Sequence, residues 1–109
     1  MKDHRFIDER SLAFDTLTAD KIERDPGLIS KAQANIDRWL ATCSPQVRPV
    51  LLEWQSLLAG PRDALLALLL GTDERAKRLR QSSPFAGALT PAERSKIILE
   101  YQRRESATA

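Results

Sequence analysis

Residues 75 to 94 read RAKRLRQSSPFAGALTPAER and join a short basic segment to a loop and then to a helix start. The basic segment follows Gly71, which is expected to end one helix, and Thr72 or Asp73, which can cap the next. At the far side of the loop, Thr90 and Glu93 have the spacing of a capping box, with a proline between them that suits the first helical turn. This stretch therefore predicts a helix, a loop and a second helix.

Prolines and glycines divide the rest of the chain into further helices. Asp25-Pro26 ends one helix and starts the next, because proline cannot continue a helix but suits its first turn. Gly60-Pro61 does the same later, and we expect Gly60 to adopt the left-handed conformation at a helix end. The predicted helices cover about residues 8–24, 26–43, 48–59, 61–70, 73–81 and 91–104.

Apolar residues recur at three- and four-residue intervals, and no segment shows the alternation of a half-buried strand. We therefore expect an all-α fold, a single compact domain of five or six short helices over residues 1–109. A frayed arm at about 1–7 and a disordered tail at about 105–109 should flank it. The expected core residues are Ile36, Trp39, Trp54, Leu65 and Leu69, with Ile97, Ile98 and Tyr101 facing inward from the last helix.

Composition limits the class of protein. The 109 residues include 17 Lys and Arg against 15 Asp and Glu, a balance too mild to indicate nucleic-acid binding by itself. The most apolar run, residues 64–70, is too short to cross a membrane, which takes about 20 residues. A single cysteine allows no internal disulfide, and the charged N-terminus is unlike a signal peptide. We expect a cytoplasmic protein.

Residues suited to catalysis are scarce. His4 and Cys43 are the only histidine and cysteine, too few for a typical metal site, and Cys43 lies on an apolar helix face. The glycines stand singly, so no glycine-rich phosphate loop is present. We predict no catalytic, cofactor-binding or metal-binding residues, and a protein that is not an enzyme.

Two binding functions remain open. The loop at residues 82–87 is either a structural plug or part of a partner surface in which Phe85 is the anchor and arginines contact its edge. The alternative is a small helical DNA-binding regulator that uses the basic residues of segment 73–81, although this segment offers few apolar residues for packing. A third interpretation is a homodimer in which exposed leucines, such as those of the helix 61–70, pair with each other while the function lies elsewhere. The predicted partner-binding residues are Arg75, Arg78, Arg80, Ser83, Phe85 and Arg94.

Residues 78–94 resemble the end of a group of small bacterial helical proteins, which share the arginine, serine-proline-phenylalanine and proline-x-glutamate-arginine pattern. The segment at residues 10–13, the pair Asp25-Pro26 and Trp39 extend the resemblance. Members look like the small partner in two-gene toxin–antitoxin modules, so the resemblance implies an antitoxin that neutralises a cognate toxin by direct binding. It implies no particular site residues. A separate DNA-binding domain followed by a long arm, which many antitoxins have, is not evident here.

Overall fold

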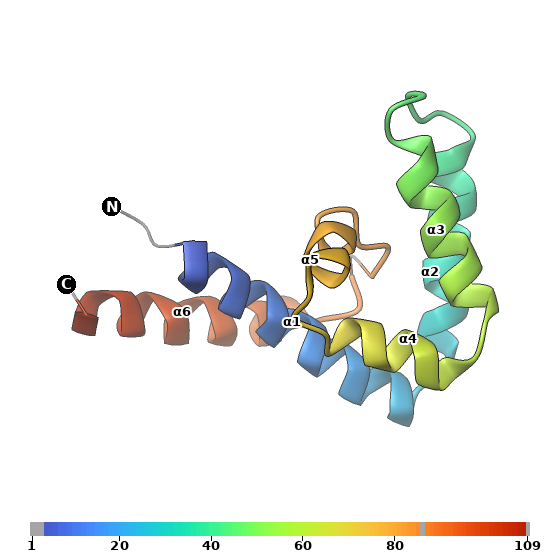
Figure 1. The fold of residues 1–109 in the computed structure, drawn as a ribbon. Coiled ribbons are helices and arrows are strands. Elements are labelled where there is room, and N and C mark those ends of the chain that lie inside the picture. The colour runs from blue at the N-terminus through green and yellow to red at the C-terminus, as the bar shows by residue number, and fades with distance from the viewer. Residues whose placement is uncertain (1–3, 86, 109) are drawn as a thin grey trace.

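The computed structural model describes residues 4–85 and 87–108, and over these residues the chain forms six α-helices and no strand (Figure 1). This confirms the expected all-α fold in one compact unit. The helices are α1 (His4–Arg24), α2 (Gly27–Leu40), α3 (Arg48–Ala59), α4 (Arg62–Leu69), α5 (Glu74–Arg80) and α6 (Pro91–Thr108).

Local hydrogen bonds fix several helix starts where the sequence predicts them. The Asp73 carboxylate accepts a hydrogen bond of 3.0 Å from the Ala76 N–H, so Asp73 rather than Thr72 caps α5. At α6 the Glu93 N–H donates to the Thr90 hydroxyl at 3.1 Å, while the Thr90 N–H donates to the Glu93 carboxylate at 2.7 Å. The reciprocal pair is a capping box, and it satisfies two N–H groups that a helix start would otherwise leave unpaired.

The helix ends differ from the prediction at four places. Helix α2 ends at Leu40 and not at about residue 43, so Cys43 lies beyond the helix and not on its apolar face. Gly60 is extended, with φ −87° and ψ −167°, and not left-handed, because the residue before a proline is driven towards extended conformations. Helix α1 already begins at His4, so residues 4–7 of the expected arm are helical. Helix α6 continues to Thr108, so most of the expected tail is helical too. The remainder of both predicted ends, residues 1–3 and 109, lies outside the described residues.

The helices form two arms, the pair α1 and α6 and the pair α2 and α3, that meet at the core (Figure 1). Helices α1 and α6 lie side by side and antiparallel, and α2 and α3 form a hairpin that projects from them. Helix α4 packs beside α1 and runs in the opposite direction. Helix α5 lies where the two arms join. The radius of gyration, 14.6 Å, exceeds the roughly 13 Å typical of this chain length. The two arms therefore leave more side-chain surface uncovered than a spherical domain would.

Trp54 is the centre of the core. Its side chain is 1 % exposed, its Nε1–H donates to the Leu79 carbonyl at 3.0 Å, and its ring meets Phe85 edge-on with centroids 6.1 Å apart. The expected core residues Ile36, Leu65 and Leu69 are also buried. Trp39 is only half-buried and packs against the edge of this core, because it lies near the outer end of the α2–α3 hairpin.

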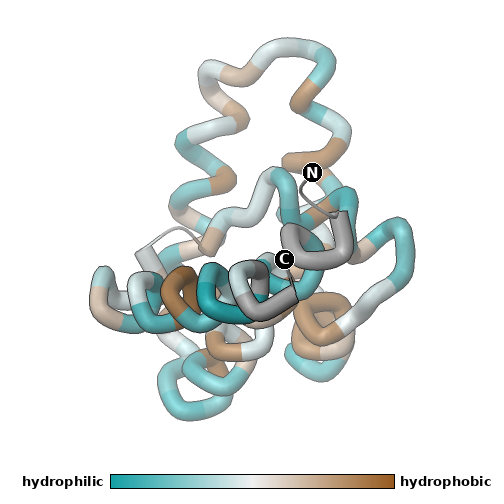
Figure 2. Tube along the Cα trace, turned by 90° about the vertical axis from the view of Figure 1, so that its left-hand side faces the viewer, coloured by the Kyte–Doolittle hydropathy of each residue, from teal (hydrophilic) through white to brown (hydrophobic). Residues whose placement is uncertain are grey.

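The outer helices contribute less to the core than expected. Ile97, Ile98 and Tyr101 are half-buried and not enclosed, because α6 packs chiefly on α1. Helix α4 buries Leu65 and Leu69 on one side, and Leu70 at its end is 50 % exposed. Figure 2 shows hydrophobic and hydrophilic segments interspersed along the chain. Among the described residues, no helix combines the length and apolar character needed to span a membrane.

Candidate partner-binding site

Arg80, one of the predicted partner-binding residues, is buried inside the fold. Its side chain is 8 % exposed, and its Nε–H donates to the Asp15 carboxylate at 3.0 Å. The same guanidinium donates to the carbonyl of Leu69 at 2.9 Å and to that of Gly71. These carbonyls lie at the C-terminal end of α4, where helix geometry leaves them without partners in the helix itself. Arg80 therefore joins α5 to α1 and α4 and offers no free side chain to a partner.

The partner of Arg80 is an unusual carboxyl group. The Asp15 side chain is 10 % exposed, and this burial raises the pKa of Asp15 to about 6, although the positive charge and hydrogen bond of Arg80 act in the opposite direction. Removal from water disfavours the ionised form of a carboxyl group. The pKa of Asp15 therefore lies closer to neutral pH than that of an ordinary aspartate.

Arg75 and Arg78 remain on the surface and share one carboxylate. The Arg75 Nε–H donates to Glu53 at 2.9 Å, and an Arg78 Nη–H donates to the same group at 3.1 Å. The two arginine side chains are 51 % and 53 % exposed. The hydrogen bond from Arg75, followed by that from Arg78, lowers the pKa of Glu53. These two arginines are accessible, but each already has an anionic partner on α3.

The loop after α5 is a structural plug. Phe85 is 7 % exposed and packs on Trp54, so it offers no anchor to a partner. Ser83 is half-buried, and its hydroxyl accepts a hydrogen bond of 3.3 Å from the Phe85 N–H. The Asn35 side-chain amide donates to the Pro84 carbonyl at 2.9 Å and ties the loop to α2. The two alternatives for this loop were a structural plug and a partner surface anchored by Phe85. The burial of Phe85 favours the plug.

Arg94, the last predicted residue, helps to attach α6 to α1. Its guanidinium lies 4.9 Å from the centre of the Phe14 ring, within the range of a cation–π contact. Beside it, Lys21 Nζ is 2.7 Å from the Glu93 carboxylate. Hydrogen bonds from Lys21 and from the Thr90 N–H lower the pKa of Glu93 to about 2. The start of α6 is thus held on the second half of α1.

A groove between α1 and α6 is a surface feature that the sequence did not predict. It has a volume of about 850 Å³ and follows both helices over several turns. On α1 the lining residues are separated alternately by three positions and by one position. This spacing places them on one face of the helix. These residues are Glu9, Leu12, Ala13, Thr16, Leu17 and Asp20.

The α6 wall of this groove repeats the same spacing. Ile97 and Tyr101 supply its apolar surface, and both are half-buried in the isolated chain. The charged side chains of the wall lie three residues apart or one turn apart. The lining residues of α6 are Glu93, Lys96, Ile97, Glu100 and Tyr101. The sequence signal that could have revealed the groove is this shared spacing on two helices.

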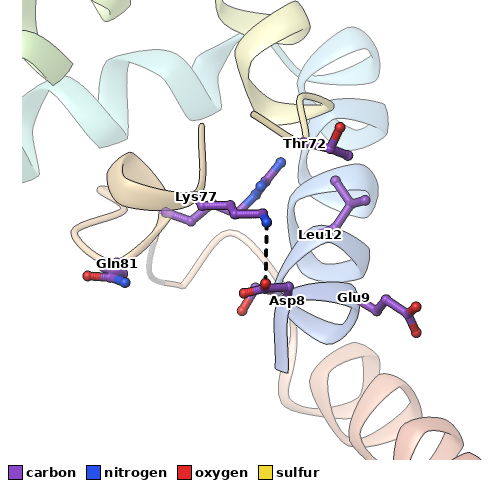
Figure 3. A pocket seen from close by; sticks show the side chains of 8 residues that line it. Asp8, Glu9, Leu12, Thr72, Lys77 and Gln81 are labelled. Atoms are coloured by element: carbon purple, nitrogen blue, oxygen red, sulfur yellow. Dashed lines mark ion pairs between the residues drawn. The ribbon is translucent and has the colours of Figure 1, made fainter. Parts of the chain in front are cut away.

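A smaller and more polar hollow lies between the start of α1 and α5 (Figure 3). It has a volume of about 450 Å³, and Lys77 Nζ lies 3.6 Å from the Asp8 carboxylate across it. Thr72 and Gln81 also line it. Within the described part of the chain, no group of three or more His, Cys, Asp or Glu residues is placed to hold a metal ion.

Fold and surface together define an all-α chain with an open apolar groove between its two longest helices. Comparison of the chain with models of known protein families, with curated proteins and with solved structures gave no match. What the chain binds is therefore inferred from its own residues.

Proposed function

We propose that this chain is a non-enzymatic protein-binding module that acts in the cytoplasm as an antitoxin, neutralising a cognate toxic protein by direct binding. The observation that carries the proposal is the groove between α1 and α6, where Leu12, Leu17 and Ile97 line an open hollow and are only half-buried. The antitoxin role itself comes from the resemblance of residues 78–94 to small partners of toxin–antitoxin modules.

The partial exposure of the apolar side chains in the groove supports a protein partner. Burying apolar surface contributes about 25 cal/mol per Å², so a partner that covers these side chains gains affinity without any change in the fold. The groove is also long, extending from Glu9 to Asp20 along α1. A hollow of this shape suits a segment of polypeptide better than a compact small molecule.

The alternative function, DNA binding through α5, has less support. Each basic residue of α5 already has a carboxylate within ion-pair distance: Arg75 and Arg78 face Glu53, and Arg80 faces Asp15. Lys77 lies 3.6 Å from Asp8. The Arg80 pair is buried, so Arg80 cannot reach a phosphate, and Arg75 and Arg78 would have to leave the carboxylate that they share.

Co-expression with each neighbouring gene of the native genome tests the proposal. We expect one neighbour to arrest growth when expressed alone, to be tolerated with this chain, and to purify with it as a complex. The proposal fails if no neighbour is toxic or if protection occurs without a complex. DNA binding that decreases steeply with salt, and that Arg75→Ala and Arg78→Ala weaken, would favour the regulator instead.

A further inference from the structure

We infer that the groove between α1 and α6 binds one amphipathic α-helix of the partner, with apolar residues at three- and four-residue spacing and Lys or Arg beside them. The inference rests on the proposed function and specifies the segment of the partner that the chain recognises.

The helical form of this segment follows from the two walls of the groove. On α1 the apolar lining residues Leu12, Ala13 and Leu17, and on α6 Ile97 and Tyr101, follow the spacing of helices that pack in bundles. Two antiparallel helices with such faces turned towards one hollow leave a place for a third helix, whose side chains can insert between theirs. The groove extends from Glu9 to Asp20, about 17 Å at 1.5 Å per residue, so it matches about three turns.

The charges of the groove favour a basic helix. Four of its five charged lining residues are carboxylates, and the fifth is Lys96. Asp20 and Glu100 pair with Arg24 and Arg104 one turn away on their own helices. Both pairs are more than half exposed, and such pairs are weak and readily exchanged.

The remaining two carboxylates of the groove, Glu93 and Glu9, differ in whether they already have a cationic partner. Glu93 is held by Lys21 and by the start of α6, and it is expected to keep these contacts. Glu9 makes no ion pair with any described residue of the chain. Lys or Arg residues of a docked helix can therefore pair with Glu9, Asp20 and Glu100, whereas a helix flanked by acidic residues would be repelled.

Fluorescence anisotropy with labelled synthetic peptides tests the inference. The probes are three helical peptides of about 14 residues: one has leucines at three- and four-residue spacing flanked by lysines, one has the same leucines flanked by glutamates, and one has the lysine composition in scrambled order. We expect the lysine-flanked peptide to bind at low salt at least about tenfold more tightly than either of the others.

Two matched pairs of variants locate the binding. Ile97→Asp removes an apolar contact from the groove wall and should weaken binding, even though its carboxylate adds to the charge that attracts lysines, whereas Leu99→Asp, at a residue that is 59 % exposed and does not line the groove, should leave binding unchanged. The double variant Glu9→Lys, Glu100→Lys should weaken binding about tenfold. The double variant Glu23→Lys, Glu74→Lys, at exposed side chains outside the groove, makes the same change in net charge and is its control. The Glu9→Lys, Glu100→Lys variant needs no buried charge, so it remains informative if Ile97→Asp impairs folding.

Three results would overturn the inference: no preference among the peptides, equal binding to the wild type and the Glu9→Lys, Glu100→Lys double variant, or a dimer of this chain that Ile97→Asp dissociates while no peptide binds. The last result would assign the groove to a second copy. A toxic neighbour that still forms a complex with the double variant and with Ile97→Asp would leave the antitoxin function standing and reject only this binding mode.

Discussion

The Arg80 guanidinium and the Asp15 carboxylate form a buried ion pair at 3.0 Å, with side chains 8 % and 10 % exposed. The pair connects residues 65 positions apart in the sequence and fixes α5 against α1. Through its bonds to the carbonyls of Leu69 and Gly71, Arg80 also holds the end of α4. A residue of the basic segment is thus part of the framework of the fold.

Replacement of Arg80 by alanine should strongly destabilise the protein. It leaves the Asp15 carboxyl and two carbonyl groups without their partner, and breaking a buried pair in this way costs about 3 to 5 kcal/mol. Arg75→Ala is the control, because the Arg75 side chain is half exposed and its pair with Glu53 should contribute less than about 1 kcal/mol. Urea denaturation measures both values. An equal decrease in the free energy of unfolding in the two variants would contradict the structural role of Arg80.

The raised pKa of Asp15 predicts a specific dependence of stability on pH. Because the pKa is about 6 in the folded protein against an ordinary 3.8, the folded state binds the proton more tightly than the unfolded state. The contribution of Asp15 to the free energy of unfolding should therefore fall by about 3 kcal/mol as pH rises from below 4 to above 6.

Asp15→Asn removes this titration and provides the comparison. Subtracting the free energy of unfolding of Asp15→Asn from that of the wild type at each pH cancels the other titrating groups. We expect this difference to decrease between about pH 4 and pH 6. A difference that rises with pH would show that the attraction of Arg80 outweighs the effect of burial.

Glu93 should show the opposite pH dependence. Its pKa is lowered to about 2 by hydrogen bonds from Lys21 and the Thr90 N–H, so its contribution to stability is present above the ordinary pKa of 4.5 and is lost as pH falls towards 2. Glu93→Gln should therefore be less stable than the wild type at neutral pH and approach it in acid. Thermal unfolding followed by circular dichroism at several pH values measures the difference in stability between the wild type and Glu93→Gln. A difference that does not change with pH would contradict the prediction.

Phe85→Ala should destabilise the fold by about 3 to 5 kcal/mol, because it removes a buried ring that packs on Trp54. Leu99→Ala, at an exposed residue of α6, should change stability by less than about 0.5 kcal/mol. Chemical denaturation compares the two variants. A stable Phe85→Ala variant would mean that the ring is an exposed anchor, as the partner-surface interpretation of the loop requires.

The local features of this protein were readable from its sequence. Asp73, Thr90 and Glu93 mark helix starts because a cap is a hydrogen bond between residues two or three positions apart. The spacing of apolar residues likewise gave the all-α class and most of the core, including Trp54 and Leu65. These features depend only on near neighbours along the chain, so the sequence contains them directly.

Tertiary structure alone decided which side chains remain available for binding. Arg75 and Arg80 lie on the same short helix, yet one is half exposed and the other is buried, because α1 and the end of α4 cover only one face of α5. Phe85 is buried because Trp54, far away in the sequence, lies beneath it. The groove between α1 and α6 exists because the first and last helices of the chain lie together. The sequence determined the helices and their apolar faces, and only the packing of distant helices determined which of those faces stayed open.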